Sequence, residues 1–190
     1  MLTNLLQKRN TGRKVDLITS YFPSQSKQSV LDFGCGDLSM AIALKDKFRS
    51  LSVTGIDIVD FGINATNVKF RKYDGKKIPF PNKSFDTVIS YHVLHHTPDP
   101  NYFFDECVRV AKKRILLVEP VPRSPVELPF MRIVDWMFNA WKSHSINTPF
   151  NFLSEREWRQ LFSKNKLKLV SRKDVELLPV FSPTGRSYLF

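Results

Sequence analysis

Short apolar runs alternate with polar, turn-rich stretches along most of the chain, and this pattern predicts the strands of a mostly parallel sheet. The first run begins at Val30 and ends in a glycine turn, after which apolar residues at helical spacing continue to Leu44. Further runs with strand character follow. They span residues 51–57, 68–73, 85–91, 114–119, 167–175 and 187–190.

Helical patterns fill some of the intervals between these runs. Residues 101–111 place their apolar side chains on one side, and a helical segment is also expected within residues 1–22. Ser154 begins another helix, because Glu157 three residues later completes a capping box. The connection at residues 58–67 is too short for a full crossover helix, so we expect turns there.

Carboxylates flank the glycine turn that follows the first strand. Asp32 lies two residues before Gly34, and Asp37 directly follows Gly36. A helix N-terminus attracts anions, so these carboxylates would compete with the pyrophosphate of a dinucleotide for the same positive field. S-adenosylmethionine (SAM) carries an ammonium and a sulfonium group and no phosphate. The turn therefore favours SAM over a dinucleotide.

Two further carboxylates follow predicted strands. Asp57 ends the second strand, 21 residues after Gly36, which is the offset at which doubly wound folds place the acid that binds ribose hydroxyls. Asp74 follows the third strand and precedes Gly75. An isolated Asp-Gly pair is a common turn. The prediction that Asp74 binds a ligand therefore depends on its position after the third strand, following the glycine turn and Asp57 in the chain.

The glycine turn, residues 31–36, resembles the first motif of class I SAM-dependent methyltransferases, which is hydrophobic-Asp-x-Gly-Cys-Gly-x-Gly. The chain departs from it at Leu38, where the motif has its last glycine. Residues 85–88 (Phe-Asp-x-Val) and 94–99 (Leu-His-His-x-x-Asp) resemble the small-molecule, type 11 branch of the family. The resemblance covers residues 28–120. It implies a single-domain α/β, Rossmann-like doubly wound fold with a mostly parallel seven-stranded sheet and an antiparallel last strand.

The resemblance also implies roles for individual residues. Asp74 would accept a hydrogen bond from the adenine amino group, and His92, or secondly His95, would act as base if the acceptor must lose a proton. The predicted SAM-binding set is Asp32, Gly34, Cys35, Gly36, Asp57, Ile58, Asp74, Gly75, Ser90 and Tyr91. The product would be S-adenosylhomocysteine. No metal is expected, since His92, His95 and Asp99 lack a third histidine or a paired cysteine at metalloenzyme spacing.

Composition narrows the functional classes. A length of 190 residues suits one domain, and Cys35 and Cys107 can form neither a disulfide framework nor a zinc-type pair. The N-terminus lacks the apolar core of a signal peptide, and no apolar run approaches the ~18 residues that cross a bilayer, so we expect a cytoplasmic protein. A formal charge of +11 is compatible with nucleic acid, an acidic small substrate or a peripheral membrane contact. The Asn- or Asp-Pro-Pro-Tyr motif of nucleic-acid adenine methylases is absent from the sequence, which disfavours nucleic acid.

The segment 120–149, which contains the aromatic stretch 130–141, has three interpretations besides a role in the core: a lid over the acceptor, a membrane-contact surface or a dimer interface. The oligomeric state stays open. The expected parts of the domain are an N-terminal helical cover (1–28), a cofactor-binding core (29–119), an aromatic lid or interface segment (120–153) and a C-terminal helix with strands (154–190). We expect methyl transfer to a small acceptor, for which an apolar or lipid-like molecule is one candidate. The alternatives are an RNA methyltransferase and a non-catalytic partner subunit.

Overall fold

The computed structural model describes residues 12, 14–21, 27–139, 149–176 and 184–190. Its strands are β1 (Ser29–Phe33), β2 (Ser52–Asp57), β3 (Lys69–Lys72), β4 (Phe85–Tyr91), β5 (Ala111–Pro120), β6 (Ser171–Glu176) and β7 (Thr184–Leu189). Its helices are α2 (Ser39–Lys47), the short 3-10 helix η1 (Leu94–His96), α3 (Pro100–Val110), α4 (Glu127–Asn139) and α5 (Glu155–Lys164). All the predicted strands and the helices at 101–111 and after Ser154 are therefore present.

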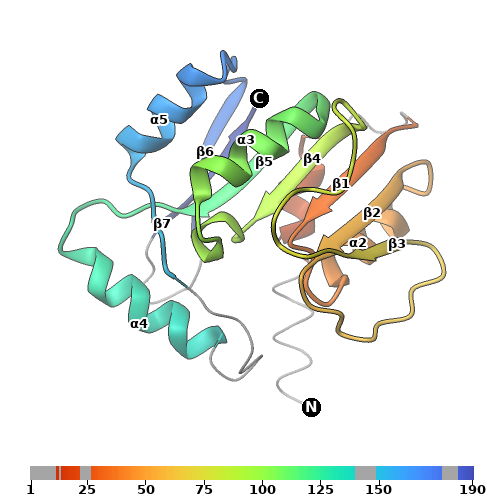
Figure 1. Ribbon diagram of the computed structural model, residues 1–190, viewed down its shortest axis with the longest axis horizontal. Coiled ribbons are helices and arrows are strands. Elements are labelled where there is room, and N and C mark those ends of the chain that lie inside the picture. Colours follow the sequence, from red (N-terminus) through yellow and green to blue (C-terminus); the bar gives the residue numbers. More distant parts are fainter. Residues whose placement is uncertain (1–11, 13, 22–26, 140–148, 177–183) are drawn as a thin grey trace. The chain divides into compact units, whose positions relative to one another are not determined.

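Hydrogen bonds join the strands into one seven-stranded sheet in the order β3-β2-β1-β4-β5-β7-β6 (Figure 1). Strand β1 pairs parallel with β2, and β2 pairs parallel with β3. Strand β7 lies between β5 and β6 and runs antiparallel to β6. The expected doubly wound fold with an antiparallel last strand is confirmed.

The chain divides into two compact units. The first comprises Met1–Ile89 and Arg109–Leu116, and the second comprises Ser90–Val108 and Leu117–Phe190. Strands β4 and β5 each contribute residues to both units. The expected internal boundaries of the domain, at residues 28, 119 and 153, stay predictions.

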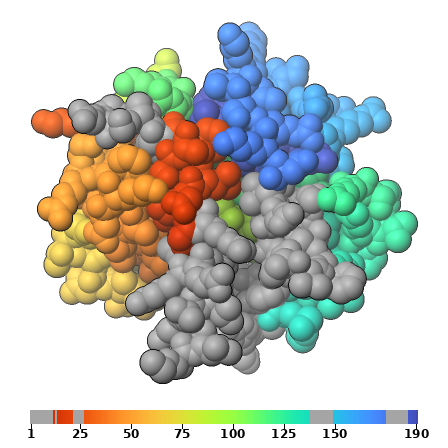
Figure 2. Space-filling model, turned by 180° about the vertical axis from the view of Figure 1, so that it is seen from behind, coloured from red at the N-terminus to blue at the C-terminus, as the bar shows by residue number. Residues whose placement is uncertain are grey.

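The first unit is built around the buried strand β1. Val30, Leu31 and Phe33 are all at most 1% exposed, as expected for a parallel strand covered on both faces. Residues 14–19 are helical, and Figure 2 shows this red segment beside the orange residues of α2. Lys47 Nζ lies 2.9 Å from Asp16 Oδ1 at this contact. The rest of the predicted N-terminal cover, residues 1–11, 13 and 22–26, lies outside the described residues.

The connections that flank β3 contain no helix among the described residues, as their lengths predicted. Phe61 and Ile63 in the β2–β3 connection are 39% and 45% exposed, so this side of the sheet is thinly covered. The β3–β4 connection is held by Arg109, whose guanidinium donates hydrogen bonds to the carbonyl oxygens of Phe80 and Ile78 at 2.8 and 3.0 Å. These bonds satisfy two carbonyl oxygens of the connection that take part in no helix or strand hydrogen bond.

An aromatic cluster forms the core of the second unit. Phe162 of α5 stacks against Trp158, and its ring centroid lies 5.0 Å from that of Tyr188 and 4.5 Å from that of Phe190. The predicted capping box of α5 is present, with Ser154 and Glu157 each accepting a backbone hydrogen bond from the other. The sequence predicts this cap well because the motif involves only residues three positions apart in the chain.

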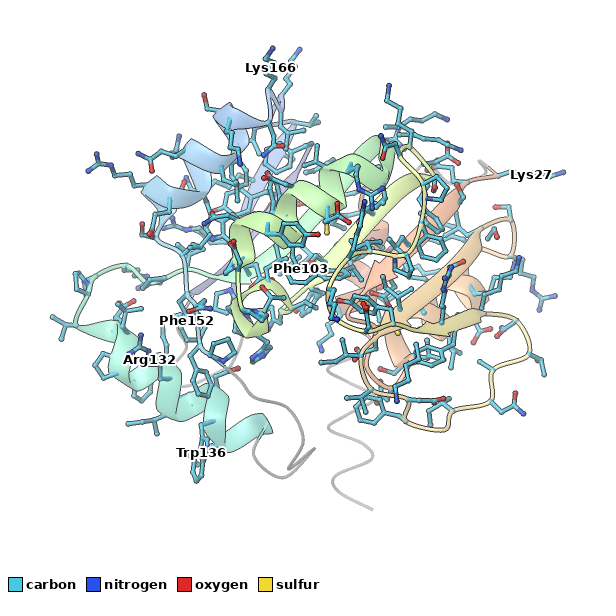
Figure 3. All side chains as sticks on the ribbon, in the orientation of Figure 1. Lys27, Phe103, Arg132, Trp136, Phe152 and Lys166 are labelled. Atoms are coloured by element: carbon cyan, nitrogen blue, oxygen red, sulfur yellow. The ribbon has the colours of Figure 1, made fainter. Side chains whose placement is uncertain are left out.

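Helix α4 presents much of its apolar surface to solvent. Met131 is buried, but Ile133, Trp136 and Met137 are 58%, 59% and 62% exposed. Figure 3 shows Trp136 pointing away from the rest of the ribbon. Among the described residues, no helix has the length and apolar character needed to span a bilayer.

Candidate functional site

The turn between β1 and α2 takes a left-handed backbone three times. Gly34, Gly36 and Leu38 have φ values of 71°, 52° and 60°. The amides of Gly34 and Cys35 donate to the carbonyl oxygen of Ile56 at 2.9 and 3.1 Å, which fixes the turn to the end of β2. A left-handed conformation costs a non-glycine residue roughly 1–2 kcal/mol. The turn therefore forms without the third glycine of the motif, at the expense of strain in Leu38.

Asp57 joins the end of β2 to this turn. Its Oδ2 accepts a hydrogen bond from the backbone N–H of Gly36 at 2.8 Å, and its Oδ1 accepts one from Val59 at 3.0 Å. The sequence-predicted residues Gly36 and Asp57 are therefore in direct contact. A carboxylate can accept about four hydrogen bonds in total. Asp57 thus retains acceptor capacity for a pair of ligand hydroxyls.

Asp32 lies beneath the turn with its side chain fully buried. Neither of its carboxylate oxygens has a hydrogen-bond partner among the described residues. Burial, and to a smaller extent the charge on Asp57, raise the pKa of Asp32 to about 7 against the opposing charge of Lys14. A buried carboxyl group without a partner is costly. A cationic ligand beside it would remove that cost, so the site fits the ammonium or sulfonium group of SAM.

Cys35 belongs to the same turn but is chemically passive. Its side chain is buried, and burial raises the pKa of the thiol well above its ordinary value, with Asp32 adding to the effect. The thiolate is the nucleophilic form of cysteine. Cys35 therefore contributes packing and a backbone amide.

Asp74, which was predicted to bind adenine, lies beside β3 near the predicted cofactor-binding residues Gly75 and Ile58. Asp74 is exposed, and its Oδ1 accepts a hydrogen bond from the amide of Lys76 at 3.0 Å in an Asp-Gly turn. A Cβ atom added at Gly75 would lie 3.2 Å from Cγ2 of Ile58, so these two predicted residues are neighbours. Ile58 is 43% exposed and offers an apolar surface to a base. Asp74 also lines an open hollow of about 580 Å³ together with Arg71, Lys72, Tyr73, Lys77, Ile78, Pro79, Phe80 and Pro81.

Ser90 and Tyr91, also predicted to bind SAM, end β4 and belong to the second unit. Ser90 Oγ is buried and has no hydrogen-bond partner among the described residues. Tyr91 stacks on His92 with ring centroids 4.5 Å apart, and burial raises the pKa of its phenol to about 12. Tyr91 is therefore a neutral ring at physiological pH.

His92, the first candidate base, has a left-handed backbone with φ of 55°. Its amide donates to the carbonyl oxygen of Val118 at 2.8 Å, which holds this conformation in place. A non-glycine residue with positive φ is uncommon, although histidine is one of the types found there more often, and such conformations gather at functional sites. The ring is half-buried beside Tyr91.

His95, the second candidate base, is buried and paired with Glu119 at the end of β5. His95 Nδ1 lies 2.5 Å from Glu119 Oε2, while Glu119 Oε1 accepts the amides of Val93 and Leu94 at 2.9 and 2.8 Å. Burial alone would lower the pKa of His95, but the carboxylates of Glu119 and Asp135 outweigh it and raise the pKa to about 9. The cationic ring has no lone pair with which to accept a proton. This geometry favours His92 over His95 as the base.

The structure brings residues to this part of the second unit that the sequence left unassigned. Asp135 of α4 lies near both His95 and His96, and the amide of Asn151 donates to the carbonyl oxygen of His95 at 2.8 Å. Phe152 stacks on the His95 ring at 4.9 Å. The available signal for Asp135 was a carboxylate in the largely apolar stretch 130–139.

Comparisons with known proteins agree with this geometry. A model of the methyltransferase domain family matches residues 6–172. The fatty-acid O-methyltransferase of Mycolicibacterium smegmatis is 28% identical over 134 residues, which cover 67% of this chain and 45% of that protein. The 27-O-demethylrifamycin SV methyltransferase of Amycolatopsis mediterranei is 29% identical over 113 residues, covering 54% and 41%. The chain thus spans less than half the length of these two relatives.

The fold also matches solved structures. The crystal structure of the YcgJ protein of Bacillus subtilis superimposes with a TM-score of 0.68 at 23% identity, and the match covers 86% of this chain and 73% of that one. A protein from Methanosarcina mazei described as a SAM-dependent methyltransferase superimposes with a TM-score of 0.69 at 20% identity, covering 91% and 95%. At these identities the likeness shows the shared fold.

Proposed function

This chain belongs to the methyltransferase domain family, whose methyl donor is SAM, and we propose that it transfers the methyl group of SAM to a small, apolar acceptor. The observation that carries the proposal is the buried carboxyl of Asp32, which has no hydrogen-bond partner among the described residues and lies under the glycine turn tied to Asp57. A phosphate-bearing nucleotide would place its negative charge against these acids, whereas SAM would place positive charge there.

In the proposed complex, the first unit holds the cofactor. Asp57 accepts hydrogen bonds from the ribose hydroxyls, and Asp74 accepts one from the adenine amino group, with Ile58 and Gly75 beside the base. Asp32 compensates the positive charge of the methionine part of SAM. Ser90 and Tyr91 remain predicted cofactor contacts of the second unit.

The bound cofactor supplies an activated methyl group with a neutral leaving group. The protein must then hold the acceptor in line with the methyl group, which can lower the barrier by several kcal/mol. For an acceptor that must lose a proton, such as a hydroxyl group, we assign the removal of that proton to His92, since imidazole is the most common general base. A fatty-acid carboxylate is already ionised at neutral pH and would need no base. His95 is assigned a positioning role, since its Nδ1 is held by Glu119.

The apolar acceptor is supported by α4 and by one relative. The exposed Ile133, Trp136 and Met137 give an apolar surface suited to a hydrocarbon chain. The relative from Mycolicibacterium smegmatis is named for fatty acids. A fatty acid is therefore the first acceptor to test.

Calorimetric titration with SAM and with S-adenosylhomocysteine tests cofactor binding. Asp57→Ala should weaken SAM binding at least about tenfold, because it removes a charge-assisted pair of hydrogen bonds. Asp60→Ala is a matched control, since Asp60 is exposed and bonds to the amide of Gly62 in the same connection. No heat with the wild-type chain would contradict the proposal and favour the non-catalytic partner subunit.

Incubation with SAM bearing a deuterated methyl group tests the acceptor. Mass spectrometry should detect a labelled methyl ester when a long-chain fatty acid is supplied. The second candidate acceptor is RNA, which the +11 charge and the Arg71, Lys72 and Lys77 side chains around the hollow beside Asp74 favour. Label in tRNA or rRNA with none in the lipid fraction would replace the proposal with that candidate.

A further inference from the structure

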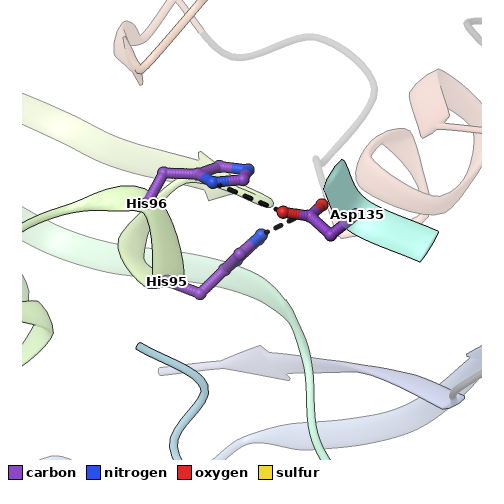
Figure 4. Close-up of side chains that lie close together, drawn as sticks. All are labelled: His95, His96 and Asp135. Carbon is purple, nitrogen blue, oxygen red and sulfur yellow. Dashed lines mark ion pairs between the residues drawn. The ribbon is translucent and has the colours of Figure 1, made fainter. Parts of the chain in front are cut away.

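Two histidines of η1 and one aspartate of α4 direct their side chains toward a common point within the second unit (Figure 4). His95 Nε2 lies 3.6 Å from Asp135 Oδ1, and His96 Nδ1 lies 3.5 Å from Asp135 Oδ2. One side-chain ligand atom from each of the three residues lies within 4.8 Å of those of the other two. The group is His95, His96 and Asp135, and we call it the His-His-Asp cluster.

We propose that the His-His-Asp cluster binds a divalent transition metal ion of the zinc type. Separations of 3.5–3.6 Å are too long for good hydrogen bonds. They are close to the roughly 3.4 Å that separates two ligands of a tetrahedral ion whose bonds are about 2.0–2.1 Å long. A small movement of His96 and Asp135 would complete the coordination.

Burial supports a ligand at this point. His95 is 2% exposed, and its Nε2 has no hydrogen-bond partner among the described residues. Buried polar atoms in native proteins are nearly always satisfied by protein, water or ions. The Nε2 atom faces Asp135, so the space between them is where the missing ligand would lie.

Glu119 provides the outer partner that histidine ligands usually have. Its carboxylate contacts Nδ1 of His95 at 2.5 Å and holds the hydrogen on that nitrogen. A metal ion at Nε2 would displace the second proton of the cationic ring, since metal binding releases protons from its ligands. The two backbone amides bound to its other oxygen fix the orientation of Glu119. At zinc sites a histidine ligand is commonly oriented in this way, by a carboxylate that binds its other ring nitrogen.

The donor set identifies the class of metal. Two imidazoles and one carboxylate suit zinc, cobalt or iron(II), whereas magnesium and calcium prefer sites made of oxygen ligands. Three protein ligands leave a coordination position open. On the premise of the proposed function, that position would accept an oxygen atom of the acceptor. The proposal replaces the sequence-based expectation of no metal, which rested on spacing and did not consider Asp135.

Metal titration of the untagged, chelator-treated protein tests the site without SAM or acceptor. Cobalt(II) should bind in a 1:1 ratio and give the visible absorption of a tetrahedral or five-coordinate complex, and zinc should displace it. Asp135→Asn and His96→Gln should each weaken cobalt binding by about 100-fold, given that even outer-shell changes cost 10–100-fold. Asp174→Asn is the matched control, since Asp174 is 64% exposed on β6 and outside the cluster.

Two results would overturn the metal site. Wild-type protein that gives no cobalt band in excess metal would leave the cluster as a set of ion pairs. Equal cobalt affinity in the wild type and in Asp135→Asn, with both proteins folded by circular dichroism, would place any bound metal elsewhere. SAM calorimetry on the same samples separates this failure from failure of the proposed function, because the cofactor residues of the first unit are unchanged.

Discussion

The side chain of Leu38 occupies the space that a side chain at Gly55 would need. A Cβ atom added at Gly55 would lie 2.6 Å from Cδ2 of Leu38 and 2.7 Å from Sγ of Cys35. Leu38 itself is 2% exposed and has φ of 60°. Strand β2 and the turn between β1 and α2 are thus in close contact at Gly55, where an added methyl group would force these side chains to move.

Gly55→Ala should therefore destabilise the protein by about 1–3 kcal/mol, the usual cost of overpacking a filled core. Urea unfolding followed by circular dichroism measures the change. Gly12→Ala is the control, because nothing lies within 4 Å of its added Cβ and residue 12 is helical and exposed. That variant should be neutral or slightly stabilising. Equal stabilities for the two variants would contradict the packing described for Leu38.

A double variant tests the contact directly. Leu38→Ala alone should cost about 2–5 kcal/mol by leaving a cavity. Combined with Gly55→Ala, the total cost should fall short of the sum by about 0.5–3 kcal/mol, since the new methyl group fills part of the vacated space. Additive costs would show that Leu38 is not the neighbour that requires residue 55 to be small.

The buried carboxyl of Asp32 predicts a pH dependence of stability. Its folded-state pKa of about 7 exceeds the value of about 4 in an unfolded chain, so between these pH values the folded state holds the proton more tightly. Stability should fall as the pH rises from about 4 to 7 and then level off, by a total on the order of 4 kcal/mol. Urea unfolding of Asp32→Asn across this range should lack that fall. Parallel curves for the two proteins would refute the assignment.

The same carboxyl predicts proton release when SAM binds. A cation beside Asp32 lowers the pKa of that carboxyl, so SAM binding near pH 6.5 should release up to one proton. Calorimetric heats in phosphate and in Tris should then differ, because the two buffers take up protons with different enthalpies. In Asp32→Asn the heats should agree once corrected for dilution. Equal heats in both buffers for the wild type would place the cationic part of SAM away from Asp32.

The sequence anticipated the contact between the glycine turn and β2 better than the surroundings of His95, for a physical reason. Gly36 and Asp57 meet because parallel strands end at one edge of the sheet, so their offset along the chain carried the information. Asp135 approaches His95 from α4, and the position of that helix depends on tertiary packing. The spacing of the two residues along the chain therefore does not predict that they are close. The left-handed Leu38 was also unforeseen, since the strain is offset by burial of a leucine and shows only in the folded chain.

His92→Gln should lower kcat by about 10²–10⁴-fold if His92 removes a proton from the acceptor, because that is the usual contribution of a general base. The affinity for SAM should stay within about twofold, since none of the proposed cofactor contacts is lost. Single-turnover assays with the identified acceptor, together with SAM calorimetry, measure the two effects. A loss of SAM affinity that accounts for the whole loss of activity would make His92 a binding residue.

Substitutions on the exposed face of α4 should distinguish an acceptor-binding surface from a membrane or dimer contact. Trp136→Ser combined with Met137→Ser should raise the KM for long-chain acceptors and leave the KM for short-chain ones unchanged, because only a long chain can cover those side chains. Sedimentation and vesicle flotation of the same variant complete the comparison. Dissociation of a dimer, or loss of binding to anionic vesicles, with unchanged KM values would assign the face to that contact. Ile133 lies on the same helix and is 58% exposed. Its substitution should therefore change the same measurement as the substitution of Trp136.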